Sequence, residues 1–377
     1  VIGFKSDVHR SALGWRRVPF IWRGTMVQFG GLAIMPFALL VLSGGGEAQH
    51  WPAWVGQVAA GLAFLLVGAG LHTIQTAGLA LATDLAPVES QPKVVGLMYV
   101  MLLLGTIASA MLFGWLLEDF SPGKLISVIQ GSAVATIVLN IVALWKQETR
   151  RPPRGAVRAA DPSFAESWRR FAQGDHARRR LLALGLGTMA FSMQDVLLEP
   201  YGGQVLGLSV ADTTKLTATL ALGGLLGFGL ASRVLGRGAD PFRVACWGAL
   251  FGVPAFLAII FAAPTGSPLL FGAGVLAIGF GGGLFGHGTL TATMNLAPPD
   301  QVGLALGAWG AVQATAAGIA VAAGGVLRDL AAASGWLAPG APPFMLVYGL
   351  EVLLLLATLL AMAPLMRRPA SKLAAGV

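Results

Sequence analysis

The chain has 377 residues, of which 55% are hydrophobic and 11% charged, with a formal net charge of +8. A soluble domain usually carries about 25% charged residues, so this composition cannot supply a water-facing surface and excludes a soluble enzyme. Its single cysteine, Cys246, excludes a framework of intramolecular disulfides. The period-two alternation of a membrane barrel is absent from the sequence, which leaves membrane-spanning helices.

Ten stretches are long and apolar enough to cross a membrane, which takes about 20 residues. The run 244–299 contains two of them, because Ala263-Pro264-Thr265-Gly266-Ser267 within it has the composition of a turn. The other eight predicted spans lie at 24–46, 48–83, 94–117, 125–145, 181–206, 216–232, 301–327 and 344–365.

The basic residues are distributed unevenly between the loops. With the first loop assigned to the cytoplasm, the loops on that side hold 22 Lys and Arg residues, against Lys124, Lys215 and Arg328 on the other side. Cytoplasmic loops of membrane proteins carry such an excess. The net positive charge is therefore interpreted as membrane orientation, and no nucleic-acid partner is expected.

The longest polar segment separates four predicted spans from six. We therefore divide the chain into an N-terminal helical half at 1–145, a basic cytoplasmic linker at 146–180 and a six-helix half at 181–377. Aromatic residues recur in the linker at helical spacing beside Arg169 and Arg170, which suits either a helix on an anionic membrane surface or a solvated linker. These aromatic residues are Phe164, Trp168 and Phe171.

The two halves contain a sequence repeat. Thr83-Asp84-Leu85-Ala86-Pro87 ends one predicted helix, and Met294-Asn295-Leu296-Ala297-Pro298 ends another. Parallel repeats of six helices characterise the major facilitator architecture. We therefore predict an all-α polytopic membrane protein with the major facilitator fold, its ten helices equivalent to helices three to twelve of twelve. Two further helices are expected before Val1.

A basic loop at the start of the chain carries a second facilitator pattern. Residues 3–17 resemble the loop between helices two and three, G-x-x-x-D-(R/K)-x-G-(R/K)-(R/K), with a longer spacing from Asp to Gly. In that pattern the glycine allows close helix approach, the aspartate accepts hydrogen bonds from helix ends, and the basic residues hold the cytoplasmic face. The alternative is a positive-inside loop without a gating role. The matching positions are Gly3, Asp7, Arg10, Gly14, Arg16 and Arg17.

Longer blocks of sequence resemble the PucC/LhaA family. They include PFIW at 19–22, QFGGLAIMPFA at 28–38, FSMQDVLLEPYGG at 191–203 and GRGADP at 236–241. The resemblance implies a facilitator-fold protein of phototrophic bacteria, not an enzyme, that assembles light-harvesting antenna complexes and handles bacteriochlorophyll. It also implies location in the intracytoplasmic photosynthetic membrane. The implied partners are antenna polypeptides, the reaction centre–antenna complex, bacteriochlorophyll synthesis enzymes and membrane lipids.

Asp195 and Glu199 stand four positions apart, on one face of the predicted helix at 181–206, with Gln194 beside them. Ionisable groups inside a membrane are costly, so they usually line a cavity, a partner contact or a proton path. These three residues are candidates for binding pigment or substrate. The alternative is a structural polar contact or a place at the membrane edge, which Pro200 favours for Glu199. Glu351 in the last helix is a further ionisable residue of this kind.

Two histidines, His72 and His287, lie in paired helices of the two halves. A neutral imidazole is a suitable ligand for the magnesium of a chlorin. Gln75, one turn from His72, adds a polar group. The family resemblance implies bacteriochlorophyll as the cofactor, and these histidines are candidate ligands of its magnesium, with no metal bound by the protein alone. The alternative for each histidine is a hydrogen bond to a neighbouring helix.

One predicted helix is rich in glycine, at positions 279, 281, 282, 283, 286 and 288. Its G-x-G-x-x-G spacing follows no predicted strand, so a nucleotide site is rejected. Small residues let helices pack closely, or leave room for a flat ligand such as a pigment ring. The rival to antenna assembly is a proton-coupled small-molecule transporter that uses Asp195 or Glu199.

Overall fold

The computed structural model is helical throughout the regular structure that it describes. The described residues are 5–6, 9, 11, 14–44, 50–87, 90–117, 121–148, 166, 169, 176–296, 302–335, 337 and 340–366. Ten of the helices in these ranges are long and apolar enough to cross a membrane. The number of spans predicted from the sequence is thus confirmed, and the chain is a multi-pass membrane protein.

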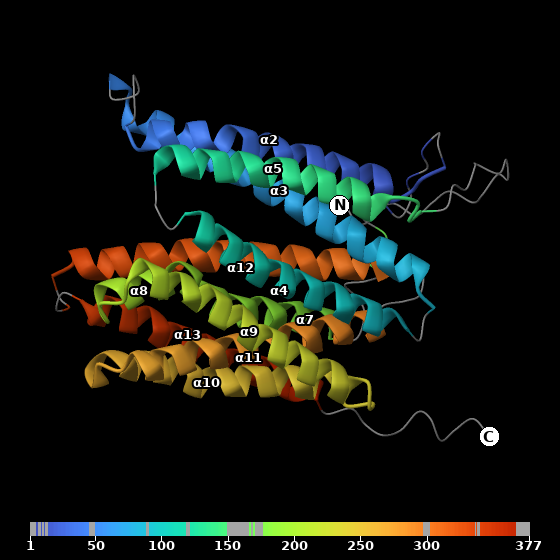
Figure 1. Ribbon diagram of the computed structural model, residues 1–377. Helices are drawn as coiled ribbons and strands as arrows, with labels where there is room; N and C mark the ends of the chain where they lie inside the picture. The colour runs from blue at the N-terminus through green and yellow to red at the C-terminus, as the bar shows by residue number, and fades with distance from the viewer. Residues whose placement is uncertain are drawn as a thin grey trace. The chain divides into compact units, whose positions relative to one another are not determined.

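The helices follow one another in the order drawn in Figure 1. Their bounds are α2 Val18–Leu42, α3 Ala53–Leu85, α4 Gln91–Leu116, α5 Pro122–Leu144, α7 Ala177–Ser192, η3 Met193–Val196, α8 Leu198–Gln204, α9 Val210–Leu235, α10 Pro241–Thr265, α11 Pro268–Leu296, α12 Val302–Ala333, α13 Ala341–Met362 and η4 Ala363–Leu365.

The ends of α10 show why the chain turns where it does. Asp240 accepts a hydrogen bond from the backbone N–H of Phe242 at 3.1 Å, and Pro241 occupies the first turn, where its missing N–H costs nothing. The helix ends at Gly266, whose φ of 58° lies in the left-handed region, which glycine adopts without strain. The turn predicted at 263–267 is confirmed.

The chain divides into two compact units. The first comprises residues 1–95, 111–167 and 301–310, and the second comprises 96–110, 168–300 and 311–377. In the first unit, α2 packs along α3 and α5 (Figure 1). A Cβ added at Gly31 of α2 would lie 2.8 Å from the carbonyl oxygen of Ala63 in α3, so the two helices touch through their backbones.

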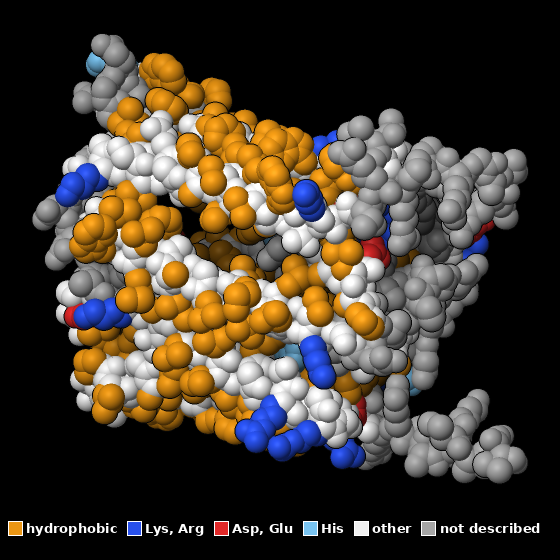
Figure 2. Space-filling model, turned by 45° about the vertical axis from the view of Figure 1, so that its right-hand side comes forward, with side chains coloured by type: hydrophobic (Ala, Val, Ile, Leu, Met, Phe, Trp, Pro, Cys, Tyr) orange, Lys and Arg blue, Asp and Glu red, His pale blue; other side chains and the backbone are white. Residues whose placement is uncertain are grey.

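The second unit has an aromatic core. α11 packs between α9 and α10, and α13 packs against α10 and α7. Aromatic side chains without exposed surface fill the space between these helices, namely Tyr201, Phe256, Phe271 and Tyr348. Leu269, Leu360 and many other large apolar side chains are exposed, and Figure 2 shows hydrophobic side chains spread over the face in view. Such a surface suits lipid.

The span predicted at 181–206 is not one continuous helix. α7 ends at Ser192, a 3₁₀ segment follows as η3, and α8 begins at Leu198. Asp195 and Glu199, which were predicted on one face of this span, lie in two successive segments of it, Asp195 in η3 and Glu199 in α8. Local 3₁₀ geometry is a common way for a membrane helix to adjust near a proline, here Pro200.

Candidate functional site

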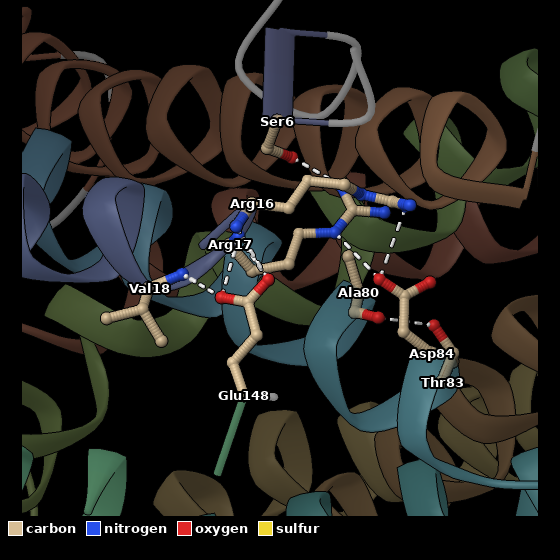
Figure 3. A network of polar contacts seen from close by, with 8 residues as sticks. All are labelled: Ser6, Arg16, Arg17, Val18, Ala80, Thr83, Asp84 and Glu148. Carbon is tan, nitrogen blue, oxygen red and sulfur yellow. Dashed lines mark hydrogen bonds and ion pairs between the residues drawn. The ribbon is translucent and has the colours of Figure 1, made fainter. Parts of the chain in front are cut away.

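Glu148 caps the N-terminus of α2 and belongs to a network of polar contacts in the first unit (Figure 3). The residue at the N-cap of α2, Arg17, makes no capping bond with its side chain. Instead the Glu148 carboxylate, which follows α5, accepts hydrogen bonds from the backbone N–H groups of Arg16 at 2.6 Å, Arg17 at 3.0 Å and Val18 at 2.9 Å. These N–H groups have no intrahelical partner and form the positive end of the helix dipole. A carboxylate there joins α5 to α2.

The side chain of Arg17 connects the same helix start to α3. Its Nε donates to Oδ2 of Asp84 at 3.0 Å, and its Nη1 donates to Oγ of Ser6 at 2.6 Å (Figure 3). The Arg17 side chain is 3% exposed, whereas Arg16, which reaches the same Asp84 oxygen at 3.3 Å, is 43% exposed. Arg17 is thus the buried member of the pair, and its planar guanidinium fits two acceptors at once.

The loop pattern is only partly within the described residues. Gly14 has a φ of 79°, which favours glycine, and its N–H donates to the carbonyl of Ser11 at 2.9 Å. Gly3, Asp7 and Arg10 lie outside the described residues. The acceptors that the structure does describe around the arginines, Asp84 and Glu148, were not selected from the sequence. For Asp84 the repeated Thr-Asp-Leu-Ala-Pro block was an available signal, but Glu148 follows no pattern.

Gln194 and Asp195 meet at the helix break in the second unit. Gln194 is 1% exposed, and its Nε2 donates to the carbonyl of Phe191 at 3.1 Å and to Oδ1 of Asp195 at 2.6 Å. Asp195 itself is exposed. Glu199 is also exposed and accepts a hydrogen bond from Thr217 of α9 at 3.2 Å, which fits the predicted structural contact. Of the three candidates, Gln194 and Asp195 therefore contact each other, and Glu199 makes a separate contact with α9.

His287 is enclosed within the second unit. It is 3% exposed, and its ring centroid lies 4.3 Å from that of Phe228 in α9. On another side, a Cβ at Gly96 of α4 would lie 3.3 Å from Cε1 of His287. Its Nδ1 is buried and has no hydrogen-bond partner among the described residues. A chlorin needs open space beside the ligating nitrogen, so His287 does not fit a pigment ring in this conformation.

His72 lies in the first unit, on α3, and is exposed, while Gln75 one turn later is half-buried. Gly68, one turn before His72, has no atom of another helix of the described chain within 4 Å of where a Cβ would stand. The imidazole of His72 therefore lies next to the open space at Gly68. Of the two histidines predicted as magnesium ligands, His72 is the one whose surroundings fit a flat ring.

Three glycines of α11 serve close helix packing. A Cβ at Gly279 or Gly283 would collide with carbonyl oxygens of α9, those of Leu220 and Gly224. At Gly288 it would lie 2.7 Å from a backbone nitrogen of α10. Of the two meanings predicted for these glycines, the structure supports close helix packing, because the space beside these three is filled by neighbouring backbone.

The sequence of the chain is similar to one family along nearly all of its length. The profile of the family described as "PUCC protein" matches residues 1–370. Protein PucC of Rhodovulum sulfidophilum is 63% identical, over 87% of this chain and 73% of that protein. Protein PucC of Cereibacter sphaeroides is 57% identical, over 97% and 80%. The bacteriochlorophyll synthase 44.5 kDa chain of Rhodobacter capsulatus is 30% identical, over 78% and 68%.

Solved structures confirm the predicted fold. The fucose:proton symporter of E. coli, a major facilitator superfamily transporter, superposes with a TM-score of 0.66 at 16% identity, over 98% of this chain and 88% of that one. A bacterial homologue of the iron transporter ferroportin gives 0.65 at 16% identity, over 97% and 87%. The chain therefore has the major facilitator fold. At this identity the likeness carries no statement about what is bound.

Proposed function

Because the chain belongs to the PUCC protein family, we propose that it is an assembly factor for bacterial light-harvesting antenna complexes. In this role it binds antenna polypeptides and delivers bacteriochlorophyll, without catalysing a reaction. The observation that carries the proposal is the match over residues 1–370, together with relatives named PucC at 63% and 57% identity. A relative named as a bacteriochlorophyll synthase chain supports the link to the pigment.

The proposed pigment contact is His72 of α3. When bound, bacteriochlorophyll would supply a magnesium ion, which the imidazole of His72 would hold through a ring nitrogen. His72 is exposed, stands one turn from the open position at Gly68, and has Gln75 on its other side as a hydrogen-bonding group. The exposed apolar surface of α3, including Phe64 and Leu65, supplies contacts for an apolar ring or for an antenna helix.

The proposed site of action is the intracytoplasmic photosynthetic membrane, with the basic loops on the cytoplasmic side. The run Arg178-Arg179-Arg180 and the loop with Arg16 and Arg17 carry the positive charge expected there. The reaction centre–antenna complex and the enzymes of bacteriochlorophyll synthesis are the further proposed partners, because they hold the pigment before and after its delivery.

Co-purification tests this function. The tagged full chain, solubilised in mild detergent from membranes of a phototrophic bacterium, is expected to retain antenna polypeptides identifiable by mass spectrometry. An unrelated tagged membrane protein from the same membranes serves as control and should not retain them. Absence of antenna polypeptides, together with proton-linked uptake of a small solute by liposomes holding the purified chain, would support the rival transporter function instead.

A further inference from the structure

Three buried polar side chains of α13 and η3 each have at least one polar atom without a hydrogen-bond partner among the described residues. Glu351 of α13 has no exposed surface, and neither of its carboxyl oxygens has a partner. The hydroxyl of Tyr348, one turn earlier, is likewise unpartnered, as is Oε1 of Gln194 in η3. None of these atoms belongs to the pigment contact proposed at His72. Buried polar groups are nearly always bonded, so three together call for a physical reason.

Glu351 faces the break between α7 and α8. The backbone N–H of Gln194 lies near its carboxyl without reaching hydrogen-bond geometry. The break is held from another side by α12, where a Cβ at Gly324 would lie 2.8 Å from the carbonyl oxygen of Met193. The carboxyl thus adjoins a 3₁₀ segment whose backbone differs from that of the helices before and after it.

No cation among the described residues stands close enough to neutralise a Glu351 carboxylate. Arg179 of α7 donates to the carbonyl of Ala361, which is ten residues, or about 15 Å, further along α13. Arg328 of α12 lies over the ring of Phe344, about 10 Å in the other direction. Arg243 of α10 is also distant: Gly252 of that helix adjoins Leu355, one turn after Glu351, and Arg243 lies nine residues, or about 13 Å, before Gly252.

The other cations of α7 are Arg178 and Arg180, which flank Arg179 in the first turn of that helix. The remaining titratable groups around α13 are acids and weak acids: η3 contributes Asp195, α8 contributes Tyr201 and α10 contributes Cys246. Tyr201 packs against Tyr348 with ring centroids 5.5 Å apart, and its hydroxyl donates to the carbonyl of Ile259. None of these groups compensates a negative charge. An isolated carboxylate buried in a membrane protein is costly by several kcal/mol, far more than its neutral form.

We propose that Glu351 is a proton-binding site. The carboxylate takes up a proton from water to form a neutral carboxylic acid, which needs no compensating cation beside the break between α7 and α8. Release of the proton to water leaves a buried charge that the present packing of α13 against η3 does not compensate, so it requires that contact to open. This inference is independent of the antenna function.

Infrared spectroscopy of the purified full chain tests the proposal. At neutral pH the wild type should show the carbonyl stretch of a protonated carboxylic acid, and this band should be lost in Glu351→Gln. Glu199→Gln is the matched control, since Glu199 is exposed and bonded to Thr217, and it should keep the band. A wild type without the band at neutral pH, or a Glu351→Gln variant that keeps it, would overturn the assignment.

Thermal unfolding in detergent provides the second measurement. The glutamine amide is neutral and similar in shape to the carboxylic acid, so Glu351→Gln should fold, and near about pH 4, where a glutamate in water is largely protonated, it should unfold close to the wild-type temperature. As pH is raised from there, the wild type should lose thermal stability relative to Glu351→Gln, because unfolding exposes Glu351 to water and releases its proton. Failure of Glu351→Gln to fold would show that the charged form is required and would contradict the proposal.

Discussion

The carboxylate of Glu148 and the backbone N–H of Val18 are joined by a 2.9 Å hydrogen bond across 130 positions of sequence. Together with the bonds to the backbone N–H groups of Arg16 and Arg17, this bond makes Glu148, which follows α5, the cap of α2. The start of α2 therefore depends on a residue that follows α5.

Glu148→Ala should lower the thermal midpoint of unfolding, because it removes the acceptor of three backbone N–H groups. Loss of a helix cap costs about 0.5–2 kcal/mol, and bonds to a charged acceptor lie near the upper end. Glu199→Ala is a matched control, since that glutamate accepts one bond of 3.2 Å at an exposed position. If both variants unfold at the same temperature, Glu148 does not stabilise α2 as described.

Arg17→Lys should destabilise the fold by about 1–3 kcal/mol, because an ammonium cannot reproduce the two directed bonds to Asp84 and Ser6. Arg16→Lys is the matched control: that side chain is 43% exposed and its ion pair with Asp84 is open to solvent, so it should cost at most about 1 kcal/mol. Chemical denaturation of the two variants in detergent measures the difference. A loss that is equal in both would contradict a special role for the buried arginine.

Gly279→Ala should destabilise the second unit by about 1–3 kcal/mol, because the added methyl group collides with the carbonyl oxygen of Leu220. Gly286→Ala places the same methyl group on the same helix where no atom of another residue lies within 4 Å. The two thermal midpoints should therefore differ, with Gly286→Ala close to the wild type. Equal midpoints would mean that α9 and α11 do not approach through Gly279.

The fold was predictable from the sequence because membrane spans are read from length and hydrophobicity. The ten spans and the turn at 263–267 follow from runs of apolar residues and from Pro264 and Gly266, which act locally. The break after Ser192 was not predicted, because Gln194, Asp195 and Pro200 were interpreted as polar and edge features of one continuous membrane helix.

The candidate site was less predictable, because it depends on which residues distant in sequence meet. Gln194 and Asp195 were selected and do meet, as neighbours in the chain. The environments of His72 and His287 looked alike in sequence, yet one histidine is exposed and the other is enclosed by Phe228 and Gly96. The contact of Glu148 with α2 leaves no local trace in either segment.

The absorption spectrum of the gently purified chain tests the central claim most directly. Protein isolated from bacteriochlorophyll-containing membranes should carry the pigment. His72→Leu should reduce the pigment bound per protein, because leucine keeps the apolar bulk and removes the ligating nitrogen, while His287→Leu should leave it near the wild-type level. Circular dichroism of each variant controls for folding. A wild-type spectrum without bacteriochlorophyll would contradict the delivery of pigment by this protein, and equal pigment in wild type and His72→Leu would contradict His72 as its ligand.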